Sequence, residues 1–475
     1  MDDLLADLPP PPDEAALLPE LHRAVAGGAG PVVVVDDDPT GTQTVSDTRV
    51  LLDWDAADLE GALSSSAPLF FLLTNSRSLP AAQAVWLNEQ IGSQLVRAHA
   101  DVPFVVVSRS DSTLRGHYPE EVLALQRGLG QTFDGHLIVP AFFEGGRYTI
   151  GDTHWVATPE PTSPSVVPAS STPFAKDPAF GYTTAHLPSW VAEKSRGRWT
   201  AEQVQSVTLE TVRQGPTAVC RRLQDIQGGV PVVVNAASYG DLAGFVLGLL
   251  EAEGRGKRFL YRTAASFVRL RAGLAPRPLL GADAIFAQAP TLETAQHGLV
   301  VVGSHVPASS AQLERLLGAA GAALPLVPIE LDVPAILSGA SADGCGEAIE
   351  AALRGGRLPV LFTSRALVSA ASGPDDNLAI GRRVMHALLA ALEQIQTRPR
   401  YVVAKGGITS HELARRGFGA GQATALGQVL PGVPVWRLEA GRGAEATRFP
   451  GLPYIVFPGN VGGPDALRQL VRLLG

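Results

Sequence analysis

Cysteine and lysine are scarce in this chain of 475 residues. The cysteines, Cys220 and Cys345, are too few and too far apart for a disulfide framework or for a zinc site built from cysteines. We interpret them as structural thiols in a reducing compartment. Lysine occurs only as Lys176, Lys194, Lys257 and Lys405. Arginine is plentiful, and genomic base composition is the simplest explanation for that bias.

Long apolar runs and basic stretches are also missing. No apolar run approaches the ~20 residues that a membrane-spanning helix needs. The net charge is −8, and no basic block interleaved with aromatic residues is present, which argues against a nucleic-acid partner. Residues 1–12 contain three aspartates, a proline cluster and no basic residue, unlike the start of a secretory signal. We expect a cytoplasmic protein that binds neither membranes nor nucleic acid.

Short apolar runs recur along the chain, and polar or small residues follow each one directly. These runs are 32–35, 69–73, 104–107, 232–234, 299–302, 360–362, 401–404 and 454–457. Helix-length stretches such as 119–127, 310–317 and 376–395 lie between them. This alternation predicts an α/β protein with mostly parallel sheets flanked by helices.

The length predicts more than one domain, because single cores rarely grow beyond ~250–300 residues. Prolines and glycines interrupt residues 275–298, where we place the domain boundary. We expect a tail with a first helix at 1–30, a first domain at 31–285 and a second domain at 286–475, with the active site in the cleft between the two domains. The segment 151–200 has no clear strand period and is either a lid or a disordered insertion.

Charged and hydroxyl side chains follow the strand at 104–107. The stretch Ser108–Gly116 contains Arg109, Asp111 and Arg115. Ligands of open α/β sheets bind at the carboxyl ends of the strands, and arginine suits a carboxylate or a phosphate. The alternative is a loop that only shapes the start of the helix at Pro119.

Two further strand ends carry charged residues. Asp36, Asp37 and Asp38 follow the first strand, and such crowded carboxylates favour a nearby Mg²⁺ ion, an arginine or a proton donor of the substrate. The alternative is a turn with solvated aspartates. Arg77 follows the strand at 69–73. If these strands are neighbours in the sheet, the arginines form an anion pocket.

Glycine-containing turns follow three strands in the second half, at 303–305, 405–410 and 458–463. Glycines there let backbone N–H groups approach phosphates, so together they favour nucleotide binding. The chain has no Walker A sequence and no well-placed G-x-G-x-x-G, which argues against a nicotinamide-dependent enzyme. No metal ligands are indicated by the spacing of histidines and acidic residues.

In this order the motifs resemble those of the four-carbon acid sugar kinase family. The matching residues are 37–41, 76–78, 110–116, 303–304, 406–409 and 459–460. The resemblance extends from about residue 31 to the C-terminus. It implies an N-terminal acid-sugar-binding domain, a C-terminal nucleotide-binding domain, and phosphorylation of the terminal hydroxyl of a tetronate such as threonate, erythronate or 3-dehydrotetronate with ATP and Mg²⁺.

The resemblance also assigns residues. We predict acid-sugar contacts at Asp37, Arg77, Arg109, Ser110, Asp111, Ser112 and Arg115. We predict ATP contacts at Ser304, Gly406, Gly407, Ile408, Thr409, Gly459 and Asn460. Arg77 and Arg109, with Arg115, would hold the carboxylate of the substrate. Asp37 or Asp38 would orient or deprotonate the attacking hydroxyl, with Asp111 as the next candidate.

Three positions depart from the family pattern. Arg109 and Thr44 stand where the family often has Lys and Asp, and Phe457-Pro458 stands where a Lys often precedes the last Gly-Asn motif. These departures leave the substrate open. They also keep two alternatives, a non-catalytic acid-sugar sensor or effector with the same fold and, third, a hydroxy-acid dehydrogenase. Residues 172–177 and 190–194 resemble the family too, which favours a lid at 151–200, and a homo-oligomer is compatible with the sequence.

Overall fold

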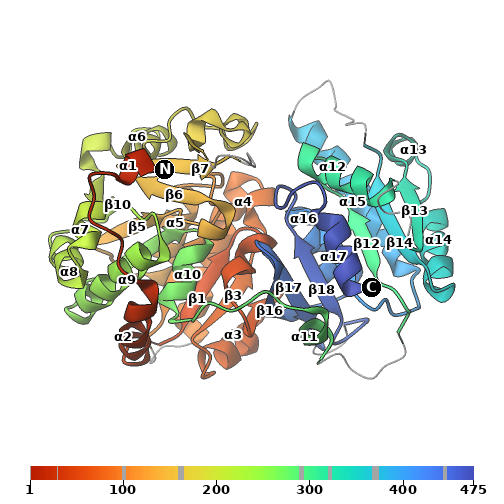
Figure 1. The fold of residues 1–475 in the computed structure, drawn as a ribbon, viewed down its shortest axis with the longest axis horizontal. Helices are drawn as coiled ribbons and strands as arrows, with labels where there is room; N and C mark the ends of the chain where they lie inside the picture. Colours follow the sequence, from red (N-terminus) through yellow and green to blue (C-terminus); the bar gives the residue numbers. More distant parts are fainter. Residues whose placement is uncertain are drawn as a thin grey trace. The chain divides into compact units, whose positions relative to one another are not determined.

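A computed structural model of the protein describes residues 2–28, 30–98, 103–158, 165–287, 294–318, 324–365, 374–441 and 447–475. The chain divides into two compact units (Figure 1). Unit 1 comprises Met1–Val45 and Trp54–Pro276, and unit 2 comprises Ser46–Asp53 and Arg277–Gly475. Each unit has its own part of the β-structure, covered by helices, so the predicted two-domain α/β class is confirmed.

Parallel strands form the centre of unit 1, in the order β3-β1-β4-β11-β5-β10-β9. Their bounds are β1 (Val32–Asp36), β3 (Leu69–Leu73), β4 (Val105–Arg109), β5 (Gly135–Val139), β9 (Gln205–Val207), β10 (Val230–Val234) and β11 (Phe259–Thr263). Side chains on both faces of β1, β3, β5 and β11 are buried. This burial is typical of a parallel sheet, because helices pack on both of its faces.

The helices of unit 1 include two packed groups. They are α1 (Asp2–Leu5), α2 (Glu14–Ala26), α3 (Ala56–Leu63), α4 (Ala81–Ala98), α5 (Glu120–Leu129), α6 (Leu187–Lys194), α7 (Leu209–Arg213), α8 (Pro216–Gln224), α9 (Tyr239–Gly254) and α10 (Ala265–Arg271). Helix α4 packs on α3 and α5, whereas α9 packs on α2, α7, α8 and α10. Most of α9 is buried on all sides, as its nearly uniform apolar sequence predicts.

A small antiparallel sheet begins just before the segment 151–200, the predicted lid or insertion, and extends into it. It consists of β6 (Arg147–Ile150), β7 (Thr153–Ala157) and β8 (Val166–Pro168), and the short helical turn η5 (Pro173–Lys176) and α6 follow it. The described part of 151–200 therefore contains short strands, helical turns and α6, and its strands are too short to give a clear period. Residues 159–164 of the predicted lid lie outside the described residues.

In unit 2 the strand order is β13-β14-β12-β15-β18-β17-β16-β2. The bounds are β2 (Thr48–Leu51), β12 (Leu299–Val302), β13 (Leu326–Leu331), β14 (Leu358–Thr363), β15 (Val402–Lys405), β16 (Gln422–Leu430), β17 (Val433–Leu438) and β18 (Pro453–Phe457). Pairs from β13 to β18 are parallel, and those from β18 to β2 are antiparallel. Strand β2 covers the edge of β16, so Ser46–Asp53 belongs to unit 2, although the predicted first domain was continuous from 31 to 285.

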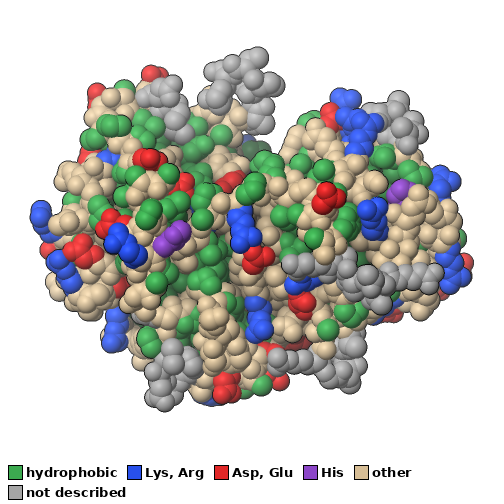
Figure 2. Space-filling model, turned by 60° about the horizontal axis from the view of Figure 1, so that its bottom comes forward, with side chains coloured by type: hydrophobic (Ala, Val, Ile, Leu, Met, Phe, Trp, Pro, Cys, Tyr) green, Lys and Arg blue, Asp and Glu red, His purple; other side chains and the backbone are tan. Residues whose placement is uncertain are grey.

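The helices of unit 2 pack around this sheet. They are α11 (Ala282–Phe286), α12 (Pro307–Leu317), α13 (Val333–Leu337), α14 (Asp343–Arg354), α15 (Pro374–Glu393), α16 (Gly407–Glu412) and α17 (Ala466–Leu474). Side chains of α12, α17 and the strands β12, β15, β17 and β18 share one core. Among the described helices, none is long and apolar enough to cross a membrane. On the face drawn in Figure 2, basic side chains lie singly or in small groups among acidic and apolar ones.

Candidate functional site

The ends of three neighbouring strands bring the predicted acid-binding residues together. Strand β1 lies between β3 and β4, and Asp36 is in register with Leu73 on one side and with Arg109 on the other. The loops that follow β1, β3 and β4 therefore leave the same edge of the parallel sheet, where ligands of such folds bind. The strand adjacency that an anion pocket requires is present.

The guanidinium of Arg77 joins the carboxylates of these loops. Arg77 donates to Asp37 from Nη2 at 2.6 Å and from Nε at 3.2 Å. Its Nη1 lies 3.5 Å from Oδ2 of Asp38 and 3.8 Å from Oδ1 of Asp111. Burial alone would lower the pKa of Arg77, but these three carboxylates raise it well above its ordinary value. Arg77 is therefore a permanent cation that ties the three loops together.

Asp111 is held as a carboxylate by two arginines. It accepts hydrogen bonds from the hydroxyl of Thr113 and, at 2.7 Å, from Nε of Arg115. Burial raises the pKa of a carboxyl group, yet Arg115 and Arg77 hold the pKa of Asp111 well below its usual range. Since a carboxylate of such low basicity is a weak general base, Asp111 fits a fixed negative charge better than a proton acceptor.

Asp38 has a similar electrostatic environment and also shapes the loop. It caps the short helical turn η1 (Pro39–Thr44) and accepts from the N–H of Thr40 at 2.9 Å. Although burial raises its pKa, Arg77 and Thr40 lower the pKa of Asp38 below its ordinary value.

Thr44 donates to the carbonyl of Ala265 at 2.7 Å and is buried. Thr44, one of the departures from the family pattern, is thus occupied by the backbone of α10.

Asp36 is a member of this site that the predicted residue set leaves out. Its Oδ1 accepts from Nη1 of Arg109 at 3.0 Å. Its Oδ2 has no hydrogen-bond partner among the described residues, and a Cβ on Gly41 would lie only 1.7 Å from it. Burial raises the pKa of Asp36 to about 7, although Arg109 opposes that shift. The carboxylate of Asp36 therefore leaves no room for a side chain at position 41. With a pKa of about 7, Asp36 changes its protonation near neutral pH.

A second buried ion pair supports the loop after β4. Arg262 on β11 lies 3.1 Å from Glu121 on α5 and donates to the carbonyl of Arg115 at 3.3 Å. Glu121 also accepts from the hydroxyl of Ser76. Sequence reasoning missed this pair because neither residue belongs to a strand-end motif. The two serines of the loop, Ser110 and Ser112, are buried in it.

In unit 2 the predicted nucleotide-binding loops follow the adjacent strands β12, β15 and β18. Lys405 is in register with Val302 on one side and with Phe457 on the other. A Cβ on Gly459 would lie 2.7 Å from Oγ of Ser304, and a Cβ on Gly406 would lie 3.1 Å from the Cβ of Ser304. The structure thus brings Ser304, Gly406 and Gly459 against one another.

The remaining predicted nucleotide contacts flank this junction. Helix α16 begins at Gly407, so the first N–H groups of Gly407, Ile408 and Thr409 have no intrahelical acceptor and suit a phosphate. The side chain of Ile408 is exposed, that of Thr409 is buried, and Asn460 is exposed. The N–H of Gly406 donates to the carbonyl of Phe457 at 2.9 Å and is already used.

Lys405 is a buried lysine beneath these loops that the predicted residue set also leaves out. Its Nζ donates to the carbonyl of Pro458 at 2.8 Å and lies 3.8 Å from the centre of the Phe457 ring. The side chain is fully buried, and burial lowers its pKa to about 7. Lys405 therefore links the end of β15 to the loop that carries Gly459.

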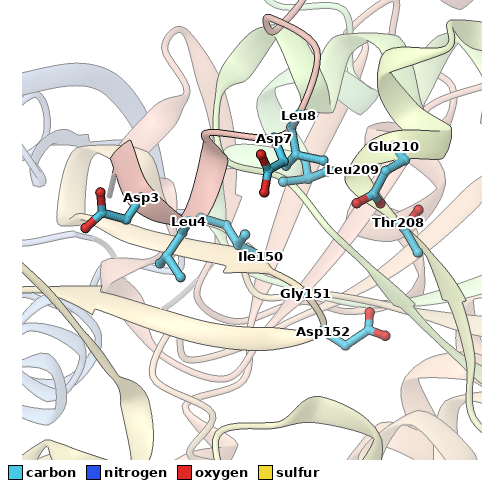
Figure 3. Close-up of a pocket in the computed structure, with 10 residues that line it drawn as sticks. All are labelled: Asp3, Leu4, Asp7, Leu8, Ile150, Gly151, Asp152, Thr208, Leu209 and Glu210. Carbon is cyan, nitrogen blue, oxygen red and sulfur yellow. The ribbon is translucent and has the colours of Figure 1, made fainter.

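A pocket of about 400 Å³ in unit 1 has the wrong charge for an acidic ligand (Figure 3). Its lining includes the acidic residues Asp3, Asp7, Asp152 and Glu210, and none of its lining residues is basic. Asp152 is engaged there by the hydroxyl of Ser206 and the amide of Asn235. We therefore place the candidate site at the ends of β1, β3 and β4 and not in this pocket.

Comparisons with known proteins agree with the division into two units. Residues 32–271 match a family described as a sugar-binding N-terminal domain, and residues 299–467 match one described as a nucleotide-binding C-terminal domain. No curated protein sequence matches the chain.

Two solved structures show the same fold. A Haemophilus influenzae protein of the DUF1537 family is 17% identical, with a TM-score of 0.58 over 93% of this chain and 100% of that chain. A Salmonella typhimurium protein provisionally described as a tRNA synthase is 17% identical, with a TM-score of 0.62 over 93% of this chain and 98% of that chain. At such low identity, these structures bear on the fold alone.

Proposed function

We propose that this chain, which belongs to the four-carbon acid sugar kinase family, transfers the γ-phosphoryl group of ATP to the terminal hydroxyl of a four-carbon sugar acid. The observation that carries the proposal is the Arg77 junction, where one guanidinium meets Asp37, Asp38 and Asp111 at the ends of three adjacent strands. This junction lies in the unit that matches a sugar-binding family. It offers carboxylate acceptors to the hydroxyls of a ligand, and Arg77 offsets their negative charge.

The carboxylates of this junction suit the hydroxyl groups of a sugar acid. Asp37 and Asp38 would accept hydrogen bonds from the attacking hydroxyl and its neighbour and so fix their direction. Asp111, whose pKa is far below its usual range, would serve as a fixed charge. In a loose phosphoryl-transfer transition state, positioning and charge stabilisation contribute more than early proton removal.

The loops of unit 2 suit the phosphates of ATP. Backbone N–H groups at Gly407–Thr409 and the tight junction of Ser304 with Gly459 would cradle them. The oxygen of the terminal hydroxyl then bonds to the γ-phosphorus, and the bond between that phosphorus and the β,γ-bridging oxygen breaks. The hydroxyl proton passes to Asp37 or Asp38, and the products are the 4-phosphate of the acid and ADP.

Magnesium enters this proposal only as the ion that the phosphates of ATP bring with them. Among the described residues, no group of three or more His, Cys, Asp and Glu side chains could hold a metal ion. The aspartates after β1 are paired with Arg77 and Arg109. We therefore assign no catalytic step to a metal ion held by the protein.

Release of ADP in the presence of Mg²⁺ and ATP tests the proposal directly. The panel should contain D- and L-threonate, erythronate and 3-dehydrotetronate, with pentonates and glycerate as longer and shorter acids. We expect turnover of at least one tetronate and weak or no turnover of the other lengths. Intact ATP binding with no turnover of any acid would overturn the kinase activity. Calorimetric binding of an acid without ADP formation would select a sensor.

A further inference from the structure

We propose that Arg147, on the small antiparallel sheet of unit 1, binds the carboxylate of the sugar acid. This inference rests on the proposed function for the class of ligand, an acid with neighbouring hydroxyls. It names a substrate-binding residue that none of the strand-end motifs contains.

The arginines in and beside the strand-end loops already have carboxylate partners. Arg77 pairs with Asp37, Arg109 with Asp36, Arg115 with Asp111 and Arg262 with Glu121, at 2.6, 3.0, 2.7 and 3.1 Å. The carboxylate of a substrate would have to compete with a fixed carboxylate at each of them. These pairs order the loops, and they leave little free positive charge for a ligand.

Arg147 has no such partner in the described part of the chain. No described carboxylate lies within 4.0 Å of its guanidinium, which donates to the backbone carbonyl of Gly145. Its Nε is buried and has no hydrogen-bond partner among the described residues. A half-buried cation without a carboxylate partner is unfavourable by itself, and an incoming carboxylate would relieve that cost.

The small sheet and the chain that follows it contact the loop after β4. Nε2 of His154 on β7 donates to the carbonyl of Ser112 at 2.7 Å, and the hydroxyl of Tyr182 donates to the carbonyl of Thr113 at 2.8 Å. Strand β6, which begins with Arg147, pairs with β7. The small sheet is thus fastened to the loop that contains Asp111.

The ring of His154 is neutral and makes hydrogen bonds through both of its nitrogens. Burial lowers the pKa of His154 to about 4, so the ring is neutral at physiological pH. With Nε2 as donor, Nδ1 accepts from the hydroxyl of Thr149 at 3.2 Å. A neutral ring at this contact adds no positive charge that would compete with Arg147 for an anion.

Arg115 and Arg147 both lie over the aromatic ring of Phe174. The ring centre of Phe174 lies 5.1 Å from Cζ of Arg115 and 5.9 Å from Cζ of Arg147. Burial lowers the pKa of Arg147, Asp111 opposes that change and Arg115 adds to it. Arg147 is therefore close to the charged groups of the junction, and its planar guanidinium can hold both oxygens of one carboxylate.

The test compares Arg147→Met with Arg147→Lys and with the control Arg127→Met, an exposed arginine of the same unit that pairs with Glu89. Binding of the preferred tetronate is measured by calorimetry without ATP. We expect Arg147→Met to weaken binding about 100-fold, the loss expected when one partner of a charged hydrogen-bonded pair is removed. Arg147→Lys should retain part of the affinity, and the control should match the wild type.

A second readout separates carboxylate binding from a structural role. The tetritol with the same hydroxyls but no carboxylate should bind wild type and Arg147→Met with equal affinity, so the preference for acid over tetritol should disappear in the variant. The melting temperature of Arg147→Met should equal or exceed that of the wild type, because the lost cation was unpaired. Unchanged acid binding in Arg147→Met would overturn the inference, as would equal losses for acid and tetritol.

Failure of the kinase proposal would look different. A wild type that binds the acid but releases no ADP overturns the kinase activity, while the calorimetric comparison still decides the role of Arg147. A wild type that binds no tetronate overturns the proposed ligand class and this inference with it.

Discussion

Arg109 and Asp36 form a buried ion pair between two neighbouring strands, with Nη1 and Oδ1 3.0 Å apart and only 4% and 1% of the side chains exposed. The second carboxylate oxygen of Asp36 has no hydrogen-bond partner among the described residues. Its pKa is raised to about 7, mainly because of burial. The charge of this pair therefore depends on pH, and Arg109 is compensated only when Asp36 is ionised.

The first prediction is that Asp36→Asn changes how stability depends on pH. The folded pKa of about 7 lies above the ordinary value of 3.8, so protonated Asp36 contributes stability that is complete below about pH 4 and is lost as pH rises through about 7. This loss should reach about 1.4 kcal/mol per pH unit within that window. Urea unfolding of wild type and Asp36→Asn at several pH values should show this loss of stability with rising pH only in the wild type.

The control for this prediction is Glu89→Gln, which removes a carboxylate from the partly exposed pair with Arg127. Exposed pairs contribute little to stability, so this variant should follow the wild-type curve. If the curves of wild type and Asp36→Asn run parallel between pH 4 and 8, Asp36 does not titrate in the window assigned to it.

The strands of both units could be predicted from the sequence because their apolar runs are short and bounded by polar residues. The predicted runs 69–73 and 299–302 coincide with β3 and β12. Strand β4 extends to Arg109, two residues past the predicted run, because its last polar residues still pair with β1 and β11. Backbone pairing continues into the site, and a hydrophobic pattern cannot detect that.

The antiparallel part of unit 2 could not be predicted in the same way. Strand β16 alternates half-buried and buried residues and contains Gly427, which weakens the pattern. Its partner β2 comes from a distant part of the sequence.

Likewise, the residue types at the strand ends indicated an anion site, but the strand order decides which carboxylate pairs with which arginine. For that reason Asp36, Arg147, Glu121 and Arg262 were missing from the predicted set.

The second prediction concerns Arg77→Ala. Removal of this guanidinium leaves Asp37 and Asp38 without their shared cation, so they should repel an anionic substrate. We expect KM for the acid to rise roughly 100-fold, and KM for ATP to change less than threefold. Steady-state kinetics with each substrate varied in turn measure the two effects, and the control is Arg127→Ala on the surface of the same unit. Equal increases in both KM values would argue against an acid-specific role.

The third prediction is the reverse pattern for Gly459→Val. A Cβ at this position would lie 2.7 Å from Oγ of Ser304, so a larger side chain must push the two loops apart. We expect KM for ATP to rise at least tenfold, with little change in KM for the acid, because backbone donors would move away from the phosphates. The matched control is Gly344→Val on α14, which has open space around its Cβ. Unchanged ATP kinetics in Gly459→Val would remove this loop from the nucleotide site.

The fourth prediction is that Lys405→Met weakens ATP binding while it stabilises the fold. Without the bond from Nζ to the carbonyl of Pro458, the loop with Gly459 loses its anchor, and we expect KM for ATP to rise about tenfold. At pH 7 the variant should unfold at the same or a higher temperature, because methionine is an apolar replacement for a buried ammonium group. Lys176→Met, at an exposed lysine of unit 1, should change neither value.

The pH dependence of stability tests whether the buried ammonium group of Lys405 makes the wild type less stable than Lys405→Met. The folded pKa of Lys405, about 7, lies below its ordinary value of 10.5. This group therefore contributes stability that is complete above about pH 10.5 and is lost as pH falls through about 7. Between pH 7 and 10 the wild type should gain up to about 1.4 kcal/mol per pH unit relative to Lys405→Met. A constant difference between the two proteins would mean that Lys405 keeps its charge throughout this range, and its anchoring of Pro458 would then be independent of pH.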